Sequence, residues 1–331
     1  MGLRVYILKR TIYLFVLILF VLMLNFVIFE LMPGDPRALF ASQFRFGGGE
    51  EGKKAAEEME RLWGFDQPLH VRFGIYMSNM LTGQFGMSYF SKDYISNEVS
   101  ERLLNTFLLV GVSTILSIII GIVLGVIAAY KRGSAFDNIA VLSSLTTYSV
   151  PSFWMGMIFL LIFSFSLGWF PSGGTSSFSA LNPPPNVLAN ISDRLGHLFL
   201  PVLTLTLFMY GGYLLLTRAT MLETLTEDYI ITARAKGLKE RTTLFKHALK
   251  NASLPLITNA AISIGFIISG AIITEQVFNY PGIGEWTWRA IANSDYPVLR
   301  CIFYLTALCV VVANFIADLL YGIVDPRIKY G

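Results

Sequence analysis

The chain has 331 residues, of which 54% are hydrophobic and only 14% are charged. Soluble domains carry about a quarter charged residues, so this composition excludes a soluble enzyme and predicts an all-α protein that crosses a membrane several times. The net charge is +3 and the basic residues are spread over several loops, which excludes a nucleic-acid-binding surface.

Six apolar runs predict six transmembrane helices. They cover residues 11–32, 104–130, 138–169, 199–217, 256–276 and 297–323. The first run follows Arg4, Lys9 and Arg10, as the core of a signal peptide would. It is longer than such a core, however, and it ends at a Pro-Gly-Asp-Pro motif, residues 33–36, instead of small residues. We therefore expect it to remain as the first transmembrane helix.

The polar stretch 33–103 predicts a small insertion outside the membrane. Three consecutive glycines, residues 47–49, indicate a flexible tip, and the charged residues 50–64 indicate a short surface helix. Residues 94–104 are expected to form an amphipathic helix that leads into the second span.

A stripe of small side chains runs along the second span. Thr114, Ser117, Gly121 and Gly125 fall on one face at helical spacing. Such a stripe indicates close packing against another helix, with the lining of a pore as the alternative.

The third span is interrupted at Pro151, which removes a hydrogen bond from the helical ladder. Residues 138–169 are therefore expected to form either one kinked helix or a helix followed by a re-entrant segment. We prefer the kinked helix, because a single crossing keeps the later topology consistent.

A polar island, residues 218–255, separates the fourth and fifth spans. Asp228 is expected to cap, and Gly237 to end, a short helix formed by Tyr229, Ile230, Ile231, Thr232, Ala233, Arg234, Ala235 and Lys236. The two alanines make this helix slim, so that another surface can approach it closely.

A second segment of the island has one apolar face. Leu244, Phe245, Ala248, Leu249 and Ala252 are spaced for it, and lysines occupy the other side. This pattern predicts a helix that lies on the membrane surface.

The charges of the short loops indicate which side of the membrane each loop faces. Basic residues gather in the N-terminal segment, in the turn 131–133, in the island and in the tail 325–330, which six crossings bring to one side. The short loops on the other side carry only Arg194, Arg289 and Arg300. The positive-inside rule therefore predicts that both termini and the island are cytoplasmic, and that the insertion 33–103 is extracytoplasmic.

The order Ala233, Gly237 and then Leu254-Pro255 resembles the cytoplasmic loop of binding-protein-dependent ABC importer permeases. Ile231 and Thr232 stand where the general pattern has Glu and Ala, and the Leu-Pro pair arrives late; both departures are similar to the branch that carries peptides and nickel. Further landmarks are Pro-Gly-Asp-Pro at 33–36, Pro-Ser-Phe-Trp at 151–154, Gly-Trp-Phe-Pro at 168–171, Glu-Gln-Val-Phe at 275–278, Tyr-Pro-Gly at 280–282 and Asp-Pro-Arg at 325–327. Nearly end to end, the chain resembles the B-type permease of dipeptide and oligopeptide importers.

The resemblance implies a single type I ABC importer permease domain over residues 1–331, in the cell membrane of a prokaryote. It implies a heterodimer with a second homologous permease, two cytoplasmic ATPase subunits that bind ATP and Mg, and an extracytoplasmic substrate-binding protein. The chain itself has no G-x-x-x-x-G-K-[ST] phosphate cradle, so ATP hydrolysis is expected on the partners. Residues 228–237 then become the contact through which ATPase movement enters this chain.

The fifth span is the candidate for the substrate path. Asn259, Ser263, Gly270 and Thr274 lie near one face, although helix packing through small residues explains them equally well.

At the outer end of that span, Glu275, Phe278 and Tyr280 are candidates for an outer gate or for a contact with the docked binding protein. The alternative for the glutamate is a carboxylate that simply faces water.

Two other classes of function are less well supported. A membrane-embedded enzyme needs a nucleophile with a base, or a metal cluster, but no G-x-S-x-G motif and no metal-ligand spacing occurs, so we expect no catalytic residue, metal or cofactor in this chain. An ATP-independent secondary carrier often has internal repeats, and none is evident. Peptides are the expected substrate, with nickel complexes and oligosaccharides as alternatives.

Overall fold

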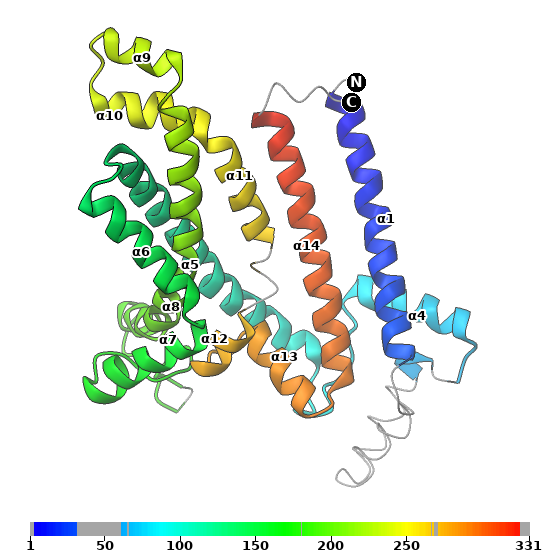
Figure 1. The fold of residues 1–331 in the computed structure, drawn as a ribbon. Helices are drawn as coiled ribbons and strands as arrows, with labels where there is room; N and C mark the ends of the chain where they lie inside the picture. Colours follow the sequence, from blue (N-terminus) through cyan, green and yellow to red (C-terminus); the bar gives the residue numbers. More distant parts are fainter. Residues whose placement is uncertain are drawn as a thin grey trace. The chain divides into compact units, whose positions relative to one another are not determined.

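The computed structural model describes residues 3–31, 61–64, 66–179, 181–265, 267 and 271–324. Within these ranges the fold is helical, with an isolated antiparallel bridge between Met87 and Tyr94 and no strand. The chain divides into two compact units, Met1–Leu104 with Gly282–Gly331 and Asn105–Pro281 (Figure 1). The predicted glycine tip and most of the predicted surface helix of the insertion lie outside the described residues.

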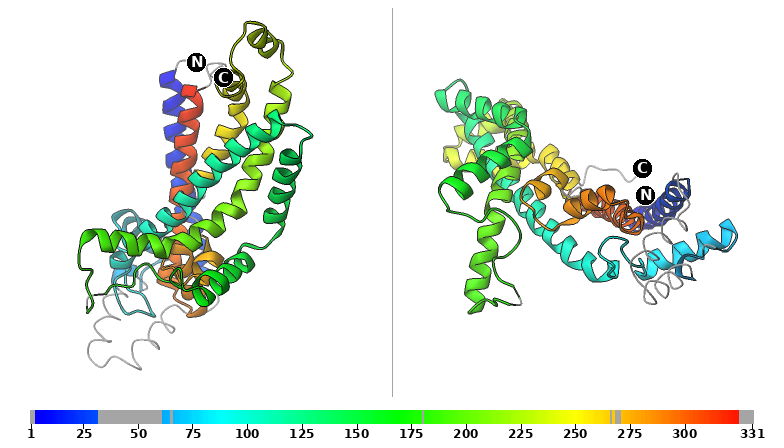
Figure 2. Two further views of the ribbon diagram at one scale, coloured as in Figure 1. Left: turned by 90° about the vertical axis from the view of Figure 1, so that its left-hand side faces the viewer. Right: turned by 90° about the horizontal axis from the view of Figure 1, so that it is seen from below.

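The first unit is built around two long apolar helices. Its elements are α1(Leu3–Glu30), α4(Leu69–Thr82), the beginning of α5(Ile95–Tyr130), α13(Ile283–Ala292) and α14(Tyr296–Val324). Helices α1 and α14 pack side by side and antiparallel, so that α1 begins and α14 ends at the same end of this unit (Figures 1 and 2). Phe26 and Tyr76 contribute to the core between α1 and α4, where Glu30 and Arg72 also form a two-pronged ion pair at 2.6 and 2.8 Å.

The second unit contains most of α5 and the helices that follow it. They are α6(Ala135–Ser149), α7(Ser152–Phe159), the π-helical segment η1(Leu160–Ser166), α8(Val187–Thr224), α9(Asp228–Ala235), α10(Glu240–Thr242), the π-helical segment η2(Thr243–Ala248), α11(Leu249–Gly265) and α12(Ile272–Val277). Helix α8 is central, because α6, α7, α11 and α12 all pack against it. The side chains of Ser134 and Asn186 cap the beginnings of α6 and α8 by accepting hydrogen bonds from backbone N–H groups.

Four described helices are long and apolar enough to cross a membrane, and a bent pair raises the number to five. The four are α1, α5, α8 and α14, which correspond to the first, second, fourth and sixth predicted spans. The helix expected over residues 94–104 is the first part of α5, which continues into the second span without a break. Helix α8 has 38 residues and is about 57 Å long, so it extends well beyond a bilayer core of about 30 Å.

The third predicted span is two helical pieces and not one kinked helix. Helix α6 ends at Ser149, a new helix begins at Ser152, and the two directions differ by 97°. Pro151 is responsible, because it has no N–H to continue the ladder and because it keeps the preceding Val150 extended, with ψ of 126°. The bend agrees with the single crossing that we preferred, as a broken span, and also with the alternative of a helix followed by a re-entrant segment.

The fifth predicted span is also interrupted. Helix α11 ends at Gly265 and α12 begins at Ile272, so the continuous helix expected over 256–276 is not observed. Ala271, immediately before α12, has φ of −108° and ψ of 68°, which is outside the helical range. Gly270 lies outside the described residues.

Candidate functional site

The short helix predicted in the polar island is present as α9. It begins at Asp228, with Glu227 in the capping position and no side-chain cap, so Asp228 stands in the first turn instead of capping it. In the first turn, the negative charge of its carboxylate is still stabilised by the positive N-terminal end of the helix dipole.

Gly237 ends α9 as predicted. Its φ of +76° is the left-handed conformation that glycine adopts without strain. The N–H of Gly237 donates to the carbonyl of Arg234, and the N–H of Leu238 donates to the carbonyl of Ala233. These two bonds form a Schellman motif, which turns the chain sharply back after two helical turns.

The face of α9 that meets the rest of the chain differs from the prediction. Ala233 is buried, together with Ile230, against the helices of its own loop. Ala233 is therefore not available to an approaching surface. Its small side chain instead allows α9 to lie close to η2. The face that remains exposed carries Tyr229 (40% exposed), Ile231 (57% exposed) and Ala235.

The other members of the predicted site lie on the exposed side of α9 or at its end. They are Thr232, Arg234 and Lys236. Arg234 forms an ion pair of 2.8 Å with Glu240, across the turn that follows the helix, with both side chains largely in solvent. Thr232 donates its hydroxyl to the carbonyl of Asp228 within the helix.

The second apolar segment of the island anchors α9 to the membrane helices. Leu244, Ala248 and Ala252 are buried in one cluster with Val126 of α5, Met221 of α8 and Ile230 of α9. The apolar face predicted for this segment is therefore confirmed, but it packs inside the protein. Phe245 is the exposed exception.

The candidate substrate-path residues do not form one open face. The Tyr213 hydroxyl of α8 donates to the Ser263 hydroxyl oxygen at 2.7 Å, Asn259 is half-buried, and Thr274 is buried in α12. Ser263 lies on α11 and Thr274 on α12, which are separate helices.

The three candidates at the outer end are all buried in their own unit. Glu275 is fully enclosed and accepts a hydrogen bond of 2.9 Å from the hydroxyl of Thr106 on α5, so the water-facing alternative is excluded in this structure. Burial, reinforced by the neighbouring Glu275 carboxylate, raises the pKa of Tyr280 to about 12.

Phe278 packs between two glycines. Its ring lies 3.0 Å from where a Cβ of Gly156 would be, and its carbonyl oxygen lies 2.5 Å from where a Cβ of Gly173 would be. Because the three side chains are covered, direct contact with an external protein is less well supported than a role inside the chain.

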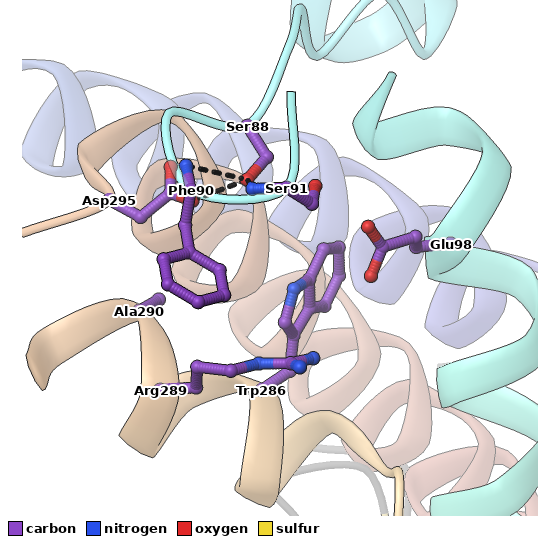
Figure 3. Close-up of a pocket in the computed structure, with 8 residues that line it drawn as sticks. All are labelled: Ser88, Phe90, Ser91, Glu98, Trp286, Arg289, Ala290 and Asp295. Atoms are coloured by element: carbon purple, nitrogen blue, oxygen red, sulfur yellow. Dashed lines mark hydrogen bonds between the residues drawn. The ribbon is translucent and has the colours of Figure 1, made fainter. Parts of the chain in front are cut away.

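A small pocket in the first unit was not predicted (Figure 3). It is lined by Ser88, Phe90, Ser91, Glu98, Trp286, Arg289, Ala290 and Asp295. Its volume of about 10 Å³ holds one water molecule and excludes a substrate.

The pocket wall is held together by Asp295, which is buried. Its carboxylate accepts hydrogen bonds from the Ser88 hydroxyl at 2.5 Å and from the N–H groups of Tyr89 and Phe90 at 3.0 and 3.1 Å. This pocket is therefore a structural joint between the loop before α5 and the turn before α14.

Among the residues that the structure describes, no group of three or more His, Cys, Asp or Glu side chains is arranged to hold a metal ion. Cys301 is buried and Cys309 half-buried, and both are free thiols.

Helices long and apolar enough to cross a membrane, with a short, partly exposed helix anchored to the ends of some of them, are the architecture of a membrane-embedded protein. The chain belongs to the family described as "Binding-protein-dependent transport system inner membrane component", whose model matches residues 121–330; the model of the associated N-terminal membrane component matches residues 3–110. The predicted family is thereby confirmed.

Relatives of known role align over almost the whole chain. The oligopeptide transport system permease protein AppB of Bacillus subtilis (strain 168) is 39% identical over 326 residues, which are 98% of this chain and 99% of that protein. The di/tripeptide transport system permease protein DppB of Pseudomonas aeruginosa (strain UCBPP-PA14) is 36% identical over 321 residues, 94% of each chain. The glutathione transport system permease protein GsiC of Escherichia coli (strain K12) is 33% identical over 325 residues, 98% of this chain and 99% of that protein.

Proposed function

We propose that this chain is a permease subunit of an ATP-driven peptide importer. The observation that carries the proposal is the end-to-end similarity to two permeases named for oligopeptides and for di- and tripeptides. The similarity to glutathione permeases agrees with it, because glutathione is itself a small peptide. Nickel complexes and oligosaccharides remain alternatives that this similarity does not favour.

We assign six crossings to the chain, with both termini and the island in the cytoplasm. Helices α1, α5, α8 and α14 supply four of them, the broken pair α6 with α7 and η1 supplies a fifth, and α11 with α12 supplies the sixth. The antiparallel packing of α1 and α14 supports this assignment, because it brings the two chain ends to one side, as an even number of crossings requires.

Helix α9 is the contact through which the ATPases act in this proposal. Tyr229 and Ile231 give its free side an apolar surface, and Ile230 on the buried side holds it on the ends of α5, α8 and α11. A partner that grips the exposed side therefore moves a helix that is already fixed to three others. ATP and Mg belong to two cytoplasmic ATPase subunits, and this chain binds neither.

The translocation path is formed with a second homologous permease, and an extracytoplasmic binding protein delivers the substrate. Asn259, Ser263, Gly270 and Thr274 remain candidates for lining that path. Glu275, Phe278 and Tyr280 act as part of an outer gate, and their burial favours gating by repacking over direct contact with the binding protein.

The test is uptake of labelled peptides by proteoliposomes that contain the complete importer. Uptake that requires ATP and both ATPases supports the proposal, whereas uptake that persists without the ATPases indicates a secondary carrier. The ligand profile of the binding protein that copurifies with the chain decides between peptides and the other substrates.

A second test concerns α9 itself. Replacing Ile231 by Asp puts a charge on the exposed apolar side without disturbing the buried side, and we expect loss of ATPase copurification and of uptake. Gly237→Asp should act similarly by opposing the left-handed turn. The matched control is Ile231→Leu, which keeps an apolar side chain and should retain the ATPases. Equal copurification in all three variants would remove α9 from the interface.

A further inference from the structure

A buried ion pair joins the first turn of α6 to the last turns of α8, close to where the chain continues into α9. The Arg218 Nε and Nη2 atoms donate to the two carboxylate oxygens of Asp137 at 2.5 and 2.8 Å. Asp137 is only 2% exposed, while the side chain of Arg218 is 26% exposed. Of the ion pairs found in the described part of the chain, this is the one that links these two helices.

The carboxylate of Asp137 also holds the turn that connects α5 to α6. The N–H of Gly133, whose φ is +77°, donates to the same carboxylate at 2.9 Å. The backbone N–H of Asp137 in turn donates to the hydroxyl of Ser134, which caps α6. One side chain therefore connects the turn after α5, the first turn of α6 and the last turns of α8.

The remaining contacts between α6 and α8 lack charge and continue from this pair toward the other end of α6. The Tyr210 hydroxyl donates to that of Ser143 at 3.3 Å, and a Cβ on Gly211 would lie 2.9 Å from the carbonyl oxygen of Ser144. The rings of Tyr148 and Phe208 stack at 6.1 Å. These contacts fix the distance between the helices, and the two-pronged ion pair adds the charge-assisted hydrogen bonds, which are stronger and more directional.

The pair lies on a continuous route from the cytoplasmic helix to the outer end. Arg218 is six residues, or about 9 Å, before the end of α8 at Thr224, and α9 follows after a short turn. On the other side, α6 leads through the bend at Pro151 to α7, which packs on α12, where Gly156 lies against Phe278. Helix α8 continues directly into α9, and α5 also touches α9 through Val126, so a movement of α9 reaches α6 through α8 and through the turn after α5. Asp137 lies where these two connections meet, because it holds both Arg218 of α8 and the N–H of Gly133 in that turn.

We propose that Asp137 and Arg218 are positioning residues that make α6 move together with α8 during the transport cycle, so that movement of α9 reaches α7 and the outer gate. This inference rests on the proposed function. Without the ion pair, the ATPases still move α9 and α8, but α6 slips and the outer gate does not follow. Hydrolysis then continues with little transport.

The experiment uses the complete importer in proteoliposomes, with ATP hydrolysis and peptide uptake measured on the same vesicles. For Asp137→Asn and Arg218→Gln we expect uptake to fall about 10-fold while stimulated hydrolysis stays within about 2-fold of the native rate, so that the ATP consumed per peptide rises several-fold. The double variant should be no worse than either single variant, because the same interaction is lost. Arg218→Lys, which keeps the charge but not the two-pronged geometry, should recover part of the uptake.

The control removes a cation from the same turn without breaking the pair. Arg132 is exposed, and Arg132→Gln should leave the ratio of hydrolysis to uptake unchanged. If uptake and hydrolysis fall in proportion in the Asp137 and Arg218 variants, the pair has only a structural role and the proposal is wrong. Native values in both variants also overturn it.

A distance measurement tests the same point without relying on activity. Spin labels at Ile139→Cys on α6 and Ala219→Cys on α8, both exposed positions, report how firmly the two helices are held. The native background should give one narrow distance distribution with and without trapped nucleotide, and Asp137→Asn should broaden it. An unchanged distribution in the variant overturns the proposal. Failure of the native importer to take up peptide overturns the proposed function instead, and the label distances still report on the pair.

Discussion

Gly125 of α5 lies against Thr217 of α8 so closely that a Cβ on residue 125 would come within 2.6 Å of the Cβ of Thr217 and 2.8 Å of the carbonyl oxygen of Leu214. One turn earlier, a Cβ on Gly121 would meet the Cβ of Tyr213 at 2.4 Å. The stripe of small residues on the second span is therefore a contact between helices, and the pore-lining alternative does not apply to it. Close approach through small residues is how helices associate in a membrane, where lipid offers no hydrophobic driving force.

Gly125→Ala should destabilise the protein, because the added methyl group meets backbone as well as side chain and neither can move without separating α5 from α8. Overpacking of this kind costs about 1–3 kcal/mol. The measurement is thermal unfolding of the purified complex in detergent, where we expect a lower midpoint and a lower yield of folded protein.

The same helix supplies the control for this prediction. A Cβ on Gly111 would meet no atom within 4 Å, so Gly111→Ala adds a methyl group without a clash. Because alanine is the better helix former by about 0.5–1 kcal/mol, this variant should be neutral or slightly stabilising. If both variants behave alike, the close approach at Gly125 is not what limits stability.

Arg102 is the centre of a charged network in the first unit. It pairs with Glu98 at 3.0 Å and with Glu285 at 2.8 Å, and its guanidinium lies 4.9 Å from the centre of the Trp286 ring. Arg102→Ala removes the closest cation from two carboxylates in a mostly buried setting, where Glu285 keeps only the more distant Arg289, and this should cost about 3 kcal/mol. We expect a clear fall in the unfolding midpoint of the purified complex.

Arg289 provides the comparison for Arg102. It also approaches Glu285, but at 3.5 Å and with its side chain 37% exposed, so solvent screens the pair. Arg289→Gln should change stability by less than about 1 kcal/mol. A larger loss at Arg289 than at Arg102 would mean that burial does not set the strength of this network.

Local signals in the sequence predicted the elements that depend on near neighbours. Gly237 indicated the end of α9 because only a left-handed residue closes that turn without strain, and the structure has φ of +76° there. The stripe of small residues on the second span likewise predicted a contact between helices, because the spacing of residues along a helix determines which side chains share a face.

Relationships between distant segments could not be read from spacing. Asp137 and Arg218 are 81 residues apart, and a lone aspartate at the start of an apolar run gives no sign of its partner. The sequence also left undecided which side of α9 faces the rest of the chain. Ala233 was interpreted as a docking surface, but small residues serve equally well to bring α9 onto its own loop. The same limit explains why Glu275 was not predicted to be enclosed.

Asp295 should control the order of the loop before α5. Its three hydrogen bonds hold Ser88, Tyr89 and Phe90 in place, and nearby Lys92 is exposed with φ of +60°. Asp295→Ala leaves the N–H groups of Tyr89 and Phe90 without this acceptor, so the loop should open more often. Limited trypsin digestion of the purified complex should then cut after Lys92 faster, by about 10-fold if the loss costs about 1.4 kcal/mol of local opening energy.

Glu98 is the matched control because it lines the same pocket but bonds to Arg102 instead of the loop. Glu98→Gln removes a carboxylate from the pocket while every loop hydrogen bond to Asp295 remains, so cutting after Lys92 should keep its native rate. Mass spectrometry of the fragments identifies the site in both variants. Equal rates for Asp295→Ala and the native protein would mean that the positive φ at Lys92 and the Met87–Tyr94 bridge hold the loop without the carboxylate. Faster cutting in Glu98→Gln would instead assign the effect to the charge of the pocket as a whole.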